Sequence, residues 1–129
     1  MTDDDVQAIG RSAAWIAARR LAHRDIADMP AGLKPADEAG GYAVQAALRD
    51  LLAPRLGPSI GWKVGATTAA MQGLLNVPSP CAGEMHRAGL HHRSAALRSS
   101  GFRRLGIECE IAMEIGTPLG GGGPVDEAM

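Results

Sequence analysis

Two glutamates that stand two residues apart, Glu108 and Glu110, could bring their carboxylates to one metal ion. They belong to residues 106–116, where isoleucine, cysteine and methionine alternate with glutamate and alanine between two closing glycines. This alternation predicts a β-strand with one apolar face and one acidic face. Side chains two apart on a strand lie roughly 7 Å from each other, so both carboxylates can lean toward a common point. Because hard divalent cations prefer carboxylate oxygens, the segment predicts a site for Mg²⁺, Mn²⁺ or Ca²⁺. An amphipathic strand whose acids only face water would have the same pattern, and the segment alone leaves that alternative open.

A lysine between two glycines, Lys63, is the second candidate for chemistry. Residues 60–65 predict a short strand, and its glycines would let a ligand approach the backbone beside the lysine ammonium group. A surface lysine on a glycine-weakened strand is the simpler alternative. Residues 67–75 then predict a short helix, and Thr67 is a candidate for binding an anion together with the first free amides of that helix. A threonine that only caps the helix would look the same.

Two amphipathic helices are expected before these elements. Residues 3–21 begin with three aspartates, which suit the positive end of a helix dipole, and continue with apolar residues at helical spacing. The same spacing returns over residues 37–52, where Pro54 is expected to end the second helix. Residues 81–100, which follow a turn with two prolines, are expected to be polar and irregular.

Composition excludes several classes of function. The chain has 129 residues and a formal net charge of −1 with mixed signs along its length, so no electrostatic case exists for nucleic acid or an anionic membrane. No apolar run approaches the roughly 20 residues needed to span a bilayer. Two cysteines and a start without a basic and apolar leader predict a reduced, cytoplasmic protein. Cys81, His86, His91 and His92 have neither of the usual zinc-ligand spacings, so zinc is not expected.

Taken in order, these motifs resemble the fumarylacetoacetate hydrolase superfamily. The resemblance is carried by Tyr-Ala-Val-Gln at 42–45, Gly-Trp-Lys-Val-Gly-Ala-Thr at 61–67 with Met-Gln at 71–72, and Ile-Glu-Cys-Glu-Ile-Ala at 107–112. It is nearest to the branch of 2-hydroxypenta-2,4-dienoate (2-oxopent-4-enoate) hydratase and 4-oxalocrotonate decarboxylase. The resemblance implies an α+β fold, with N-terminal helices over residues 1–58 and the beginning of a mixed β-rich catalytic domain over 59–129. The residues at 80–83 depart from this branch, where an acid and an aromatic often stand between the proline and the glycine, which puts the substrate in doubt.

By this resemblance Glu108 and Glu110 would bind Mg²⁺ or Mn²⁺, with a third carboxylate from later in the chain. Lys63 would be catalytic and would line the substrate site with Thr67, and the metal's charge would lower the pKa of the lysine. The implied function is a metal-dependent lyase, a hydratase acting on a short unsaturated 2-oxo acid such as 2-hydroxypenta-2,4-dienoate in aromatic-compound catabolism. The partner of the chain would be that 2-oxo acid, and the protein would be a homo-oligomer or bind a partner subunit.

Two alternatives stay open. One is a decarboxylase of the 4-oxalocrotonate type, which needs the same stabilised enolate. The other is a truncated, non-catalytic remnant that binds a partner subunit. Truncation is expected because the resemblance covers about the first half of a family member, and because residues 120–129 contain a glycine run followed by the proline and acids that open a helix.

Overall fold

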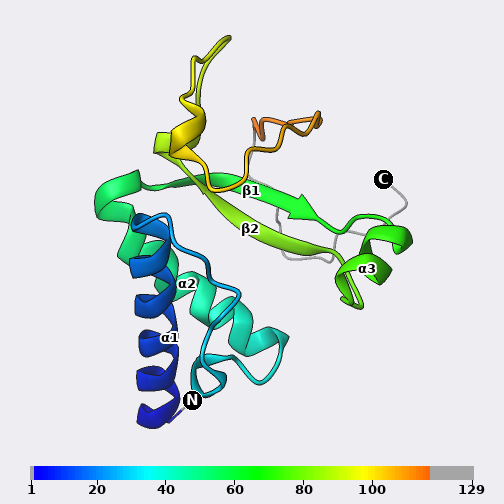
Figure 1. Ribbon diagram of the computed structural model, residues 1–129. Coiled ribbons are helices and arrows are strands. Elements are labelled where there is room, and N and C mark those ends of the chain that lie inside the picture. The colour runs from blue at the N-terminus through cyan, green and yellow to red at the C-terminus, as the bar shows by residue number, and fades with distance from the viewer. Residues whose placement is uncertain (1, 117–129) are drawn as a thin grey trace.

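The structure, a computed structural model, describes residues 2–116 (Figure 1). Within these residues helices combine with a two-stranded antiparallel sheet, so the described part is mixed α+β. None of its helices is long and apolar enough to cross a membrane. The glycine run and helix start expected at 120–129 lie outside the described residues. The elements, with η for a 3-10 helix, are in order α1 (Asp3–Leu21), η1 (Ala31–Leu33), α2 (Glu38–Leu56), β1 (Ser59–Gly65), α3 (Ala69–Leu75), β2 (Cys81–His86), η2 (Arg87–Gly89) and η3 (Ser99–Gly101).

Side chains cap the beginnings of α1 and α2. The Thr2 hydroxyl accepts a hydrogen bond from the Asp5 amide, and the Asp5 carboxylate accepts one from the Thr2 amide, which forms a capping box at α1. Asp37 caps α2 by accepting a hydrogen bond from the Gly40 amide at 2.8 Å. These caps satisfy amide groups that the first turn of a helix leaves without partners.

The expected end of the second helix near residue 52 was wrong, because α2 continues to Leu56 with Pro54 inside it. A proline removes one backbone hydrogen bond and crowds the carbonyl four residues earlier. Here it falls in the last turn, and Leu56 packs against the buried core. The last turn of the helix thus remains packed although it contains a proline.

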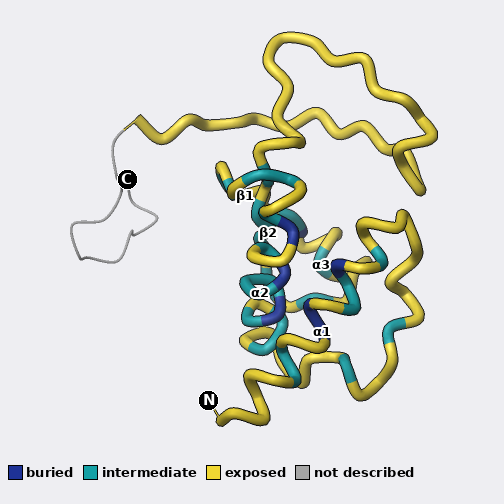
Figure 2. Tube along the Cα trace, turned by 90° about the vertical axis from the view of Figure 1, so that its left-hand side faces the viewer, coloured by how far each residue is buried: buried dark blue, intermediate teal, exposed yellow. Residues whose placement is uncertain are grey.

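The core lies between α1 and α2. Leu52, at 1% exposed, is its largest fully buried side chain. Two alanines of α1 allow the helices to approach closely, and the α2 side chains fill the space that remains. Figure 2 shows the buried residues concentrated where the helices face each other. The buried cluster consists of Ala13, Ala17, Val44, Leu48 and Leu52.

Strands β1 and β2 form an antiparallel pair, with α3 in the connection between them, and β2 lies against α2 (Figure 1). β1 was predicted from the sequence, but β2 falls in the region expected to be irregular, and that expectation was wrong. Hydrogen bonds from α2 hold β2 in place: Gln45 donates to the Ala82 carbonyl at 2.9 Å, and the Tyr42 hydroxyl accepts from the Ala82 amide at 3.1 Å. Arg49 Nη1 lies 3.1 Å from Glu84 Oε1. Side chains of helix α2 therefore fix the position of β2 in the sheet.

The strand predicted for residues 106–116 does not form, and the prediction was wrong. A strand is stable only when a neighbouring strand satisfies its backbone groups, and residues 106–116 pair with neither β1 nor β2. Its apolar residues are left in solvent: Ile107 is 89% exposed and Ile111 94% exposed. The sequence has the alternating pattern of a strand, but within residues 2–116 this segment pairs with no strand.

Candidate functional site

The three charged residues singled out from the sequence lie together in the structure. Lys63 Nζ is 2.5 Å from Glu108 Oε2 and 2.9 Å from Glu110 Oε1. The two carboxylates therefore converge on one cationic group, although they belong to a segment that is not a strand. Sequence reasoning expected convergence from the strand period, whereas in the structure the lysine brings them together.

The sheet gives Lys63 its position. In β1 a glycine stands two residues away on each side of it, Gly61 and Gly65, and the residue paired with it on β2 is Gly83. An added Cβ at Gly83 would meet no atom within 4 Å, so the space opposite the lysine is open, whereas Met85 and Cys81 lie against Gly61 and Gly65. The side chains of Lys63, Glu108 and Glu110 are 45%, 71% and 49% exposed, so the cluster is accessible to a solute.

Electrostatics within the cluster favour its charged form. Hydrogen bonds from the ammonium group to Glu108 and then Glu110 raise the pKa of Lys63 above its ordinary value. The hydrogen bond and the charge of Lys63 lower the pKa of Glu108. Two carboxylates face the ammonium group and stabilise its charge in this arrangement, and the lowered lysine pKa expected beside a metal ion stays a prediction for the metal-bound site.

Thr67 follows β1 and is exposed, but the residue that caps α3 is its neighbour. The Thr68 hydroxyl accepts a hydrogen bond from the Met71 amide at 3.3 Å. Between strand and helix, Ala66 has a φ of 54°, a left-handed conformation, and its carbonyl accepts a hydrogen bond from the Gln72 side chain at 2.9 Å. The capping role considered for Thr67 thus falls to Thr68.

The donor chemistry of Glu108 and Glu110 fits a hard divalent cation, because the Lys63 ammonium shows that both carboxylates can meet on one positive centre. The number of donors is small: among residues 2–116 no group of three or more His, Cys, Asp or Glu side chains is arranged to hold a metal. A cation at this point would take the place of the ammonium group and would keep much of its coordination shell as water or substrate.

Three residues of α2 that sequence reasoning left without a role prove to position the sheet. Tyr42 and Gln45 bind both backbone groups of Ala82, and Arg49 holds Glu84, whose side chain is 8% exposed. Glu84 Oε2 is buried and has no hydrogen-bond partner among the described residues. Polar residues at helical spacing, four and three apart, were the available signal, but a surface helix has the same pattern.

Comparisons with protein-family models, with curated proteins and with solved structures each found no match to this chain.

Proposed function

We propose that the chain belongs to a metal-dependent lyase with a fumarylacetoacetate-hydrolase-like core, a hydratase acting on a short unsaturated 2-oxo acid such as 2-hydroxypenta-2,4-dienoate. The observation that carries the proposal is the convergence of Glu108 and Glu110 on the point that Lys63 Nζ occupies. Two carboxylates and one lysine at a common, accessible point are the groups needed to bind a cation and a 2-oxo acid side by side.

In this proposal Glu108 and Glu110 hold Mg²⁺ or Mn²⁺. The cation supplies charge that stabilises the enolate form of a 2-oxo acid. Lys63, released from the carboxylates, faces the substrate and transfers a proton at the substrate carbon chain, since an amine held in an open strand can act as acid and base. Thr67, exposed just beyond β1, donates its hydroxyl hydrogen to the substrate carboxylate.

A decarboxylase acting on a related 2-oxo acid would use the same residues, because loss of carbon dioxide also leaves an enolate. A second class of function, a non-catalytic chain that binds a partner subunit or a second copy, is favoured by a different observation. Ile107, Ile111 and Met113 are between 83% and 94% exposed on one segment, and exposed apolar residues in series are typical of a surface that another chain covers.

Titration of the 129-residue chain with Mn²⁺ by calorimetry tests the metal site. We expect weak binding, because two carboxylates leave most of the shell to water. Glu108→Gln and Glu110→Gln should each weaken binding by about tenfold or more, since each removes one anionic ligand. Glu114→Gln changes a glutamate of the same segment that is outside the cluster, and it should leave the affinity unchanged. Equal affinity in all four proteins would refute the assignment.

The substrate class is tested first by binding and then by turnover. Bound Mn²⁺ relaxes the proton signals of a nearby small molecule, so 2-oxopentanoate should be relaxed strongly and pentanoate, which lacks the 2-oxo group, should not. Loss of the ultraviolet absorbance of 2-hydroxypenta-2,4-dienoate would then report hydration, and Lys63→Met should abolish it while retaining Mn²⁺. Metal binding with no difference between the two acids would reject the 2-oxo acid proposal and favour the partner-binding alternative.

A further inference from the structure

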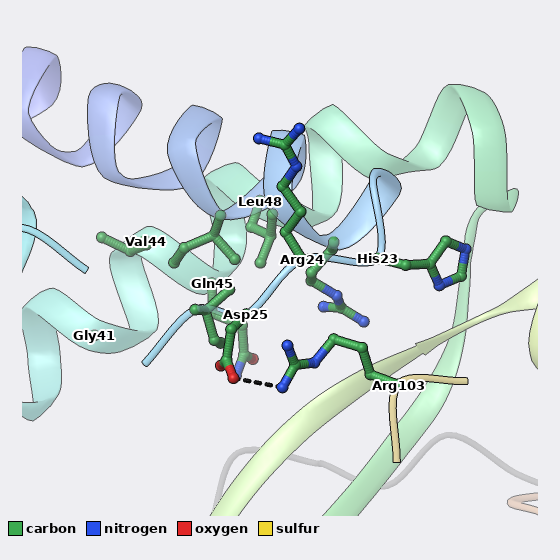
Figure 3. A pocket seen from close by; sticks show the side chains of 11 residues that line it. His23, Arg24, Asp25, Gly41, Val44, Gln45, Leu48 and Arg103 are labelled. Atoms are coloured by element: carbon green, nitrogen blue, oxygen red, sulfur yellow. Dashed lines mark hydrogen bonds and ion pairs between the residues drawn. The ribbon is translucent and has the colours of Figure 1, made fainter. Parts of the chain in front are cut away.

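A pocket of about 530 Å³ lies between the end of α1, the middle of α2 and the loop that bears Arg103 (Figure 3). Its lining includes Ile16 and two core residues, Val44 and Leu48, which are 5% and 8% exposed. The volume falls within the range of about 300–1,000 Å³ that is typical of small-molecule sites. None of Lys63, Glu108 or Glu110 lines it, so the pocket is separate from the candidate metal site.

The charged residues of the pocket are predominantly basic. Arg20, Arg24 and Arg103 line it together with His23, and among the described residues Asp25 is the one acid in the lining. That acid is already engaged: its carboxylate accepts a hydrogen bond from the Ala27 amide at 3.0 Å and binds the Arg103 guanidinium, as the dashed line in Figure 3 marks. The amide hydrogen bond and then the charge of Arg103 lower the pKa of Asp25, which keeps it ionised.

Two guanidinium groups, those of Arg20 and Arg24, pair with no acid of the part of the chain that the structure describes. Among residues 2–116, the ion pairs and side-chain hydrogen bonds include neither Arg20 nor Arg24. The end of the α1 dipole offsets only about half an elementary charge. An excess of positive charge is left beside an apolar surface.

We propose that this pocket binds a small organic anion, with its apolar or aromatic body on Ile16, Val44 and Leu48 and its head group between Arg20 and Arg24. Guanidinium groups bind carboxylates and phosphates through paired hydrogen bonds, and either head group would suit these arginines. The apolar lining distinguishes such a ligand from a bare inorganic ion, which would gain nothing from it.

Four probes separate the contributions of charge and apolar body: benzoate, phenyl phosphate, inorganic phosphate and benzyl alcohol. In calorimetric titrations of the full chain, at least one of benzoate and phenyl phosphate should bind, and the tighter of the two identifies the preferred head group. Benzyl alcohol has the ring but no charge, and inorganic phosphate has charge but no ring. Each should bind with an affinity at least about tenfold lower than that of the preferred aromatic anion. Binding of benzyl alcohol equal to that of benzoate, or no binding of either aromatic anion, would overturn the proposal.

Two variants with matched controls locate the site. The double variant Arg20→Gln/Arg24→Gln should lower the affinity for the anion by about tenfold or more. Arg11→Gln/Arg55→Gln, which removes the same charge outside the pocket, should leave the affinity unchanged. Gly41 lines the pocket, and an added Cβ there meets no atom within 4 Å. Gly41→Leu should therefore fill the space and block binding while all arginines remain.

Gly10 of α1 is equally open but does not line the pocket, so Gly10→Leu is the control for a leucine placed in a helix. Circular dichroism of each variant checks that its helices are intact. Undiminished anion affinity in folded Gly41→Leu protein, or in the folded double arginine variant, would refute the assignment of the ligand to this pocket.

Discussion

Truncation of Leu52 to alanine tests whether the α1 and α2 pair is the part of the chain that holds the rest in place. Leu52 is 1% exposed and packs with the alanines of α1, and the hydrogen bonds that fix β2 come from the same helix. Its neighbour Leu51 is 48% exposed. The two residues share helix and residue type and differ in burial, so they form a matched pair.

The expected magnitude follows from that difference in burial. Leu52→Ala removes three carbon groups from a closed core at about 0.8 kcal/mol each. The cavity left behind adds to this, which gives a loss of about 3 kcal/mol in the free energy of unfolding. Leu51→Ala removes the same atoms from a half-exposed site and should cost about 1 kcal/mol or less. The difference of about 2 kcal/mol corresponds to roughly a 30-fold change in the folding equilibrium.

Urea unfolding followed by far-ultraviolet circular dichroism measures both losses, and tryptophan fluorescence gives a second probe. Trp15 reports on α1 and Trp62 on β1, so the fluorescence follows both parts of the described fold. If Leu52→Ala proves too unstable to measure, Leu52→Met, which nearly conserves volume, should cost less than about 1.5 kcal/mol. Equal losses for Leu51→Ala and Leu52→Ala would show that α2 does not pack as described.

Two further predictions concern the start of α2 and the response of the lysine cluster to pH. Asp37→Ala should cost about 1 kcal/mol of stability in urea unfolding because the Gly40 amide loses its acceptor, whereas Asp37→Asn, which keeps an acceptor, should cost little. For Glu108, whose pKa is lowered from 4.5, the interaction stabilises the folded chain above 4.5 and is lost as the pH falls through the lowered value. For Lys63, whose pKa is raised from 10.5, it stabilises below 10.5 and is lost as the pH rises through the raised value. The carboxyl carbon signal of Glu108 in an NMR titration should have its midpoint below 4.5 and return toward 4.5 in Lys63→Met, and an unchanged midpoint in that variant would show that the lysine is not the cause.

Three elements could be predicted from the sequence because nearby residues specify them. The span of α1, the beginning of α2 near residue 37 and strand β1 were all predicted. Each is specified within a short window, by a capping side chain, apolar spacing or a bounding glycine. The resemblance placed Lys63, Glu108 and Glu110 around one metal and substrate site, but the direct ion pairs between the lysine and the two glutamates were not predicted.

The errors concern pairing between distant segments. Strand β2 has a mixed pattern, and it is a strand because β1 and α2 supply partners for its backbone and for Glu84. Residues 106–116 have the better strand pattern but lack such partners within the described residues. Strand propensity describes how well a side chain fits a half-buried pleated surface, and that surface must first exist.

The two halves of the candidate site consequently have different supports. Lys63 is held by a chain of contacts that runs from the core through α2 and β2 to β1. Within residues 2–116 Glu108 and Glu110 have no such scaffold, and one hydrogen bond and two exposed ion pairs connect them to Lys63 of the sheet. Exposed ion pairs add little to stability, so this tether of the segment to β1 is weak. In the proposed function, a cation that took the place of the ammonium group would supply the positive charge that both carboxylates face.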